Sequence, residues 1–172
     1  MNTQIYVGTY AKYNNGILNG EWLDIADYSS AEEIVQAMLE LHEDEEDPEL
    51  MLQDIEDDAQ ALGVSESMSP EDWEEVYEAL KAVKDSHLEL EAIKAYASNT
   101  GEKITPSLVE EAEEAYQGQY DSDEDFAQEL AEELGYIDGN ASWPYTCIDW
   151  EWAARELMYD YFEMDGYYFR NL

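Results

Sequence analysis

The chain has 172 residues, of which 44 are Asp or Glu and only 7 are Lys or Arg, so its formal net charge is −37. Seven scattered cations cannot form the basic patch that binding to nucleic acid or to an anionic membrane surface requires. No apolar run is long enough to span a bilayer, the first residues lack the features of a signal peptide, and the single cysteine, Cys147, excludes an internal disulfide. Aromatic residues make up 13% of the chain, which favours a folded cytoplasmic protein over a disordered acidic one.

The first part of the chain, residues 1–63, is predicted to form a small α+β domain. Residues 4–10, 17–25 and 49–55 are rich in β-branched, aromatic or aliphatic side chains and predict three strands. Asn14-Asn15-Gly16 indicates a turn, and Asn19-Gly20 a bulge or kink. Ser29 or Ser30 can cap a helix after the second strand. The apolar stripe of this helix, at helical spacing, consists of Ile34, Val35, Met38 and Leu41. An acidic loop at residues 42–47 follows it.

Residues 64–103 predict a central helical domain. Ser69 is a capping serine, Pro70 occupies the first helical position, and acids follow near the positive end of the helix dipole. One face of this helix is apolar, and it consists of Trp73, Val76, Tyr77, Leu80 and Val83. Residues 88–97 predict a second helix. Residues 64–103 contain four of the seven basic residues. Their net charge is therefore only −6, against −15 for residues 1–63 and −16 for residues 104–172.

Residues 104–172 predict a C-terminal α+β domain of helices and short strands. Thr105-Pro106 begins one helix, and Ser122 caps another, which has Leu134 on its inward face and ends at Gly135. A helix over residues 149–161 has two apolar faces, which indicates that it is buried or contacts a partner. Candidates for this packing centre or dimer contact are Trp150, Trp152 and Tyr159. Residues 166–169 predict a closing strand.

No arrangement of residues indicates catalysis, a metal or a cofactor, so the sequence predicts a protein that is not an enzyme. Asp121, Asp123 and Asp125 stand at positions of a calcium-binding loop, but Phe126 replaces the required glycine and begins an apolar helical stripe. A solvated acidic helix face is therefore expected there. His42 and His87 are far apart in sequence, which favours two ordinary histidines over a zinc site.

Three explanations of the charge compete. Halophilic adaptation predicts an even spread of acid, against which the lysine-bearing middle of the chain argues. An acidic binder or chaperone of basic DNA-associated proteins usually carries blocks of charge in tails, whereas acids here alternate with apolar residues on structured elements. The third explanation is a folded imitation of DNA. The −37 charge corresponds to roughly 60 Å of duplex, and a compact domain of this length has a radius of gyration of only roughly 16 Å. A DNA mimic would therefore need small domains arranged in a row.

The sequence resembles the ArdA family of antirestriction proteins along nearly its whole length. Several long stretches match in the same order, which is a stronger signal than a short motif. They are Ile5–Gly16, Gly20–Asp24, Leu41–Asp54, Ala115–Tyr120, Glu124–Gly135, Ile148–Trp150 with Ala154–Leu157, and Asp165–Arg170. Residues 64–100 are the least similar to the family.

The resemblance implies a fold and a function. Family members are carried on mobile elements, such as conjugative plasmids, and act in the bacterial cytoplasm. They occupy the DNA-binding site of type I restriction–modification enzymes and block restriction, and often modification too. The family fold is an elongated row of three small α+β domains that dimerises through the C-terminal domain into an acidic DNA mimic. The segment from Asp125 to Leu134 falls on the stretch called the antirestriction motif.

The expected DNA-mimicking surface consists of carboxylates in the acidic loop and on the outward faces of three predicted helices. No nucleic acid or membrane partner is expected. The carboxylates are Glu43, Asp44, Glu45, Glu46, Asp47, Glu71, Asp72, Glu74, Glu75, Glu78, Glu110, Glu111, Glu113, Glu114, Asp123, Glu124, Asp125, Glu129, Glu132 and Glu133.

Overall fold

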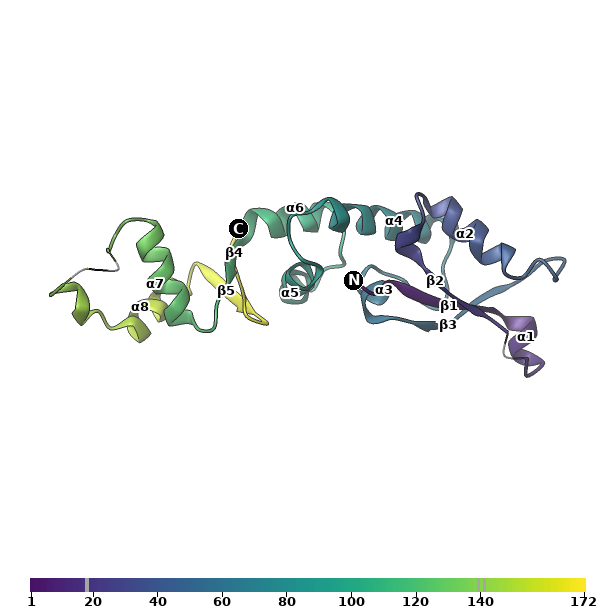
Figure 1. Cartoon of the computed structure of the whole chain (residues 1–172), viewed down its shortest axis with the longest axis horizontal. Helices are drawn as coiled ribbons and strands as arrows, with labels where there is room; N and C mark the ends of the chain where they lie inside the picture. Colours follow the sequence, from purple (N-terminus) through teal and green to yellow (C-terminus); the bar gives the residue numbers. More distant parts are fainter. Residues whose placement is uncertain (18, 139, 141) are drawn as a thin grey trace.

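The elements of the molecule are laid out in an elongated row (Figure 1). The computed structural model describes residues 1–17, 19–138, 140 and 142–172. The chain is α+β, as predicted, and contains two small antiparallel sheets. Figure 1 shows the first sheet at one end with α2, the helices α4, α5 and α6 in the middle, and the second sheet followed by α7 and α8 at the other end. In the part of the chain that is described, no helix combines the length and the apolar character needed to cross a bilayer.

The N-terminal sheet has the strand order β2-β1-β3, with β1 at Gln4–Thr9, β2 at Glu21–Asp24 and β3 at Leu50–Ile55. Its inner face packs on α2 (Ala31–Glu40), because alternate strand residues and one stripe of the helix are apolar. Ser30 caps α2 by accepting a hydrogen bond from the Glu33 N–H. A short helix, α3 (Asp57–Ala61), follows β3.

The second predicted strand, over residues 17–25, is wrong in its extent. Its last residue, Ile25, begins a 3-10 helix at Ile25–Asp27, because the Asp24 carboxylate accepts a hydrogen bond from the Ala26 N–H and caps that turn. The predicted turn at residues 14–16 is preceded by a short helix, α1 (Tyr10–Asn14), which Thr9 caps. The irregularity in this sheet is not at Asn19-Gly20: it lies in the pairing of β1 with β3, between Tyr6 and Val7. Leu18 lies outside the described residues.

Three helices form the middle of the molecule: α4 (Pro70–Asp85), α5 (Leu90–Thr100) and α6 (Pro106–Ala115). The predicted start of α4 is confirmed, since Ser69 and Asp72 form a reciprocal capping box and Pro70 is the first helical residue. The helix predicted over residues 88–97 begins and ends later, and Gly101 ends it in the left-handed conformation at φ 73°. Thr105 caps α6 through the Leu108 N–H.

The C-terminal sheet has the order β4-β6-β5, with β4 at Tyr116–Gln119, β5 at Tyr161–Met164 and β6 at Tyr167–Arg170. Helix α7 (Asp123–Glu133) begins at the Ser122 cap, as predicted, and Gly135 follows its end at φ 72°. A 3-10 turn at Tyr145–Cys147 precedes α8 (Trp150–Leu157), which packs against α7. Strand β4 was not predicted.

Two predictions for the C-terminal segment are wrong. The helix expected over residues 149–161 ends at Leu157, because Tyr161 pairs with Arg170 as the first residue of β5. Leu134, expected on the inward face of α7, is 58% exposed, because it follows the last helical residue as the C-cap.

The buried side chains form one main cluster that runs from the first sheet to the second. It extends from Ile5 and Val7 through the apolar faces of α4, α5 and α6 to Phe169 of β6. Around Phe126 of α7, a second group of rings includes Tyr120, Tyr161 and Tyr168, with centroids 4.7–5.5 Å apart. The burial continues across residues 63 and 103, and the division into three domains at these boundaries stays a prediction.

Candidate functional site

The carboxylates singled out in the sequence lie on four surfaces: the loop at residues 43–47 and the outward faces of α4, α6 and α7. Sixteen of the twenty are exposed, and the four half-buried ones are Glu45, Glu113, Asp123 and Glu124. The hydrogen bonds and ion pairs of the chain divide these groups into two kinds. Some carboxylates are engaged by donors of the same chain, and we call them held; the others are open to solvent.

The loop after α2 contains two held carboxylates. The buried Lys12 ammonium lies 2.7 Å from Asp44 Oδ1 and 3.5 Å from Glu45 Oε1. It also lies 3.0 Å from Nδ1 of the buried His42, and Thr9 Oγ1 donates to Glu45 Oε1 at 2.7 Å. The hydrogen bond from Lys12 lowers the pKa of the Asp44 carboxyl, and the same bond raises the pKa of Lys12. This loop is therefore anchored by a cation from α1.

Other carboxylates are held at helix ends and between helices. Asp72 belongs to the capping box of α4, and the hydrogen bonds from Ser69 lower its pKa. Glu113 of α6 accepts hydrogen bonds from Ser86 Oγ at 2.6 Å and from the His87 N–H at 3.2 Å, and these donors lower its pKa. Glu114 lies 3.8 Å from the Arg170 guanidinium, and Asp123 accepts a hydrogen bond from the Tyr168 hydroxyl at 2.7 Å.

Open carboxylates lie in the loop after α2, where Glu43, Glu46 and Asp47 are exposed, and on the helices that form the middle and the far end of the molecule. On α4 they are Glu71, Glu74, Glu75 and Glu78, and on α7 they are Glu129, Glu132 and Glu133. All seven are exposed, and no basic side chain among the described residues lies within ion-pair distance of any of them. These groups are available to cations from outside the chain.

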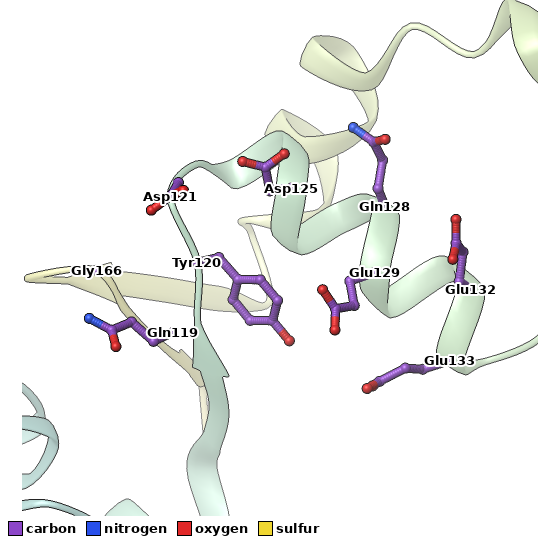
Figure 2. A pocket seen from close by; sticks show the side chains of 9 residues that line it. All are labelled: Gln119, Tyr120, Asp121, Asp125, Gln128, Glu129, Glu132, Glu133 and Gly166. Atoms are coloured by element: carbon purple, nitrogen blue, oxygen red, sulfur yellow. The ribbon is translucent and has the colours of Figure 1, made fainter. Parts of the chain in front are cut away.

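A groove of about 1000 Å³ runs beside α7 (Figure 2). Its walls are the carboxylate face of α7 on one side and the end of β4 with the following turn on the other. The lining residues are Gln119, Tyr120, Asp121, Asp125, Gln128, Glu129, Glu132, Glu133 and Gly166. Figure 2 shows the Tyr120 ring and the Glu129 carboxylate directed into the same space. Burial, followed by the negative charges of Glu129 and Glu133, raises the pKa of the Tyr120 hydroxyl. Five of the lining residues are carboxylates and none is basic, so the field in this groove is negative.

The spacing of the open carboxylates follows from helix geometry. Glu71, Glu74, Glu75 and Glu78 span seven helical steps, which places one charge per about 3.5 Å of helix axis. Glu129, Glu132 and Glu133 span four steps of α7, or one charge per about 3 Å. One strand of duplex DNA carries a charge about every 3.4 Å. Each of the two helices thus matches the axial charge density of one DNA strand.

The aromatic candidates near the C-terminus are only partly buried within this chain. Trp150 is half-buried, whereas Trp152 is 59% exposed and Tyr159 is 76% exposed. Sequence reasoning missed Tyr136 and Trp143, which are also exposed, at 74% and 78%. Both lie outside helices and strands, where hydrophobic periodicity gives no signal. The sequence also gave no sign of the part of Tyr120 in the groove, because this depends on the unpredicted strand β4.

Asp121, Asp123 and Asp125 do not form a calcium-binding loop, since Asp123 is the first residue of α7. More generally, the described part of the chain contains no group of three or more His, Cys, Asp or Glu residues arranged to hold a metal ion. His42 and His87 each lie in separate hydrogen-bonded networks, with Lys12 and Glu113 respectively.

Comparison with known proteins identifies the family. No curated protein matches the chain at a significant level. The family described as "Antirestriction protein (ArdA)" matches residues 5–170, which is nearly the whole chain and includes both sheets and all the acidic surfaces described above. The chain therefore belongs to the ArdA family of antirestriction proteins.

Proposed function

We propose that this antirestriction protein is a DNA mimic that occupies the DNA-binding site of a type I restriction–modification enzyme. The observation that carries the proposal is the set of open carboxylates on α4 and α7, spaced along each helix about as phosphates are along one DNA strand. The elongated arrangement of the elements supports it further, because the charges are distributed along a row (Figure 1).

The mechanism is electrostatic. The Lys and Arg residues that line a DNA-binding groove pair with the open carboxylates and release the counterions that surround the acidic surface. The held carboxylates, such as Asp44 and Glu113, contribute to folding because their charge is already matched by donors of the same chain. Phosphate contacts position DNA but do not specify its sequence. Inhibition is therefore independent of the recognition sequence of the enzyme, and it blocks restriction and, through the shared DNA site, modification.

The same proposal includes a homodimer that forms through the C-terminal aromatic residues. Trp152 and Tyr159 are large apolar groups that are more than half exposed in the single chain. Leu134, Tyr136 and Trp143 lie between α7 and α8 in sequence and are exposed too. Aromatic residues are enriched at the cores of protein interfaces, where their burial excludes water. A dimer that buries Trp152 places two acidic rows end to end.

Competition with DNA tests the proposed function. A fluorescent duplex is bound to the purified methyltransferase core of a type I enzyme, and the protein is titrated in while the anisotropy is recorded. We expect stoichiometric displacement of the duplex. A protein that leaves this complex intact and instead binds histones would be an acidic chaperone of basic DNA-associated proteins, and the DNA-mimic proposal would be wrong.

Sedimentation equilibrium tests the proposed homodimer separately from DNA displacement. Sedimentation equilibrium of the unaltered chain is expected to give twice the mass of the monomer, and Trp152→Ser is expected to shift the equilibrium toward the monomer. The matched control is Trp22→Ser, which changes an exposed tryptophan of β2, and β2 belongs to the sheet at the other end of the molecule (Figure 1). Equal effects of the two substitutions contradict the assignment of Trp152 to the interface.

A further inference from the structure

The outer face of the N-terminal sheet carries an aromatic pair next to a carboxylate. Tyr6 of β1 lies directly opposite Trp22 of β2, and on its other side it lies opposite Asp54 of β3. Residues that are opposite each other in a sheet point to the same face. The neighbouring residues Ile5 and Val7 are fully buried on the inner face. Trp22, Tyr6 and Asp54 therefore form one row across the solvent-facing side of the sheet, which we call the aromatic row.

Two members of the aromatic row, Trp22 and Asp54, are exposed, Tyr6 is half-buried, and the two rings are fixed in place. The Tyr6 and Trp22 rings meet edge to face, with centroids 5.4 Å apart and an interplanar angle of 64°. Gly20 lies against the Tyr6 ring so closely that a Cβ there would be 2.8 Å from Tyr6 Cε1. Trp22 is nevertheless 43% exposed. A large ring is thus presented to solvent in a defined position, which reduces the entropy lost when something binds to it.

Among the described residues, no basic side chain forms an ion pair with this row. Five of its seven basic side chains are already engaged with a carboxylate or a backbone carbonyl elsewhere in the described residues: Lys12, Lys84, Lys94, Arg155 and Arg170. The other two lie outside the sheet: Lys81 is on α4, and Lys103 follows α5. The Asp54 carboxylate accepts a hydrogen bond from its neighbouring Ile55 N–H and is exposed. This hydrogen bond does not neutralise the Asp54 charge, and no basic side chain among the described residues lies within ion-pair distance of it. A cation from another molecule can therefore reach both the ring and the carboxylate.

We propose that the aromatic row binds an arginine side chain of the protein whose DNA site is occupied, an inference that rests on the proposed function. The occupant follows from charge complementarity, since a chain of net charge −37 attracts cationic partners. A guanidinium is planar: it stacks on an aromatic face and also forms bidentate hydrogen bonds with a carboxylate. The open carboxylates then substitute for phosphates, and the aromatic row adds a contact that a phosphate cannot make.

The test uses three substitutions in the DNA-displacement assay with the methyltransferase core. Trp22→Leu keeps an apolar side chain but removes the ring, and we expect displacement to become about 5- to 30-fold weaker. Trp22→Phe keeps a smaller ring and should stay within about threefold of the unaltered chain. The control is Tyr13→Leu, which removes a 53% exposed ring on α1 outside the row and should have no effect.

The outcomes separate this inference from the proposed function. If the unaltered chain fails to displace DNA, the proposed function is wrong and the inference is overturned with it. If the unaltered chain displaces DNA and Trp22→Leu does so equally well, only the arginine contact is overturned. A Trp22→Phe chain that loses as much as Trp22→Leu also overturns it. Asp54→Asn tests the same contact without a change at the ring. We expect this substitution to weaken DNA displacement about two- to fivefold. Displacement equal to that of the unaltered chain overturns the bidentate pairing.

Discussion

The acidic loop after α2 and the acidic face of α7 contain similar runs of carboxylates but use them in different ways. In the loop, Lys12 reaches from α1 to Asp44 and Glu45, and Thr9 donates to Glu45 as well. Along the α7 groove, none of the lining residues is basic. The difference teaches that the net charge of −37 has two parts: held carboxylates, which are matched within the fold, and open ones, which are available to a partner.

The strongest way to break this comparison is to remove the open charge of α4 and α7 together. Replacing Glu71, Glu74, Glu75, Glu78, Glu129, Glu132 and Glu133 together by Gln removes the seven open carboxylates of α4 and α7. At about 0.5 kcal/mol for each exposed pair, we expect the affinity for the methyltransferase core to fall by about 300-fold. The matched control replaces the same seven residues by Asp, which keeps the charge. Equal losses in both variants would show that charge is not the cause.

Removing the cation of the loop tests the held carboxylates. In Lys12→Met, Asp44 and Glu45 lose their counter-charge, and Nδ1 of the buried His42 loses its partner while Nε2 keeps its contact with the Val7 carbonyl. We expect a lower midpoint of thermal unfolding and faster hydrogen exchange in residues 42–47, with DNA displacement by the folded protein within about threefold of the unaltered value. The control is Lys81→Met, an exposed lysine on α4. Unchanged exchange in the loop would show that Lys12 does not hold it.

A second held carboxylate gives a pH-dependent effect. Asp58 lies 2.9 Å from Lys94 Nζ and accepts a hydrogen bond from the Asn2 N–H at 2.6 Å. Burial raises its pKa, but the hydrogen bonds from Lys94 and Asn2 and the charge of Lys94 outweigh this, so that the pKa is lowered. An unfolded Asp has a pKa of about 3.9. The stabilisation is therefore fully present above about pH 5 and is lost as the pH falls through the lower folded-state pKa.

Asp58→Asn is expected to lower the free energy of unfolding by about 1 kcal/mol at pH 7, because the partner Lys94 is partly exposed to solvent. Urea unfolding at pH 7 and at pH 3 measures the difference from the unaltered chain, which should shrink at pH 3. DNA displacement at pH 7 should be unchanged, since Asp58 is not an open carboxylate. A difference that grows on acidification would contradict the direction of the pKa shift.

The smallest effect is expected for a single open carboxylate. Glu129 lies in the groove beside Tyr120 (Figure 2), but it is one of many charges that contact the partner. Glu129→Gln should therefore weaken DNA displacement less than about threefold. Complete loss of displacement from this one substitution would mean that the groove makes a specific contact, and the distributed electrostatic mechanism would then be wrong.

Local signals in the sequence predict several element ends well. Ser69 with Pro70 begins α4, and Ser122 and Gly135 delimit α7, because capping depends on residues within one turn of the helix end. The strand expected over residues 17–25 was wrong at its end, where the Asp24 carboxylate caps a 3-10 turn. The helix expected over residues 149–161 was wrong because pairing with a distant segment decides the outcome there. Tyr161, for example, belongs to β5 because it pairs with Arg170.

The exposure of the acids also follows from the sequence, since amphipathic helices place their charged residues outward. Which carboxylates are held does not follow from it. The ion pairs of Lys12 with Asp44 and of Lys94 with Asp58 join residues more than 30 positions apart. Such pairs depend on tertiary packing, which no local pattern encodes. The division into held and open carboxylates therefore requires the structure.

The dependence of binding on salt tests the electrostatic mechanism most directly. The affinity of the unaltered chain for the methyltransferase core is measured by the DNA-displacement assay from 50 to 300 mM NaCl. If open carboxylates replace phosphates, the logarithm of the affinity falls linearly with the logarithm of the salt concentration, by about 1000-fold or more over this range for six or more contacts. An affinity that stays constant from 50 to 300 mM NaCl would contradict the mechanism.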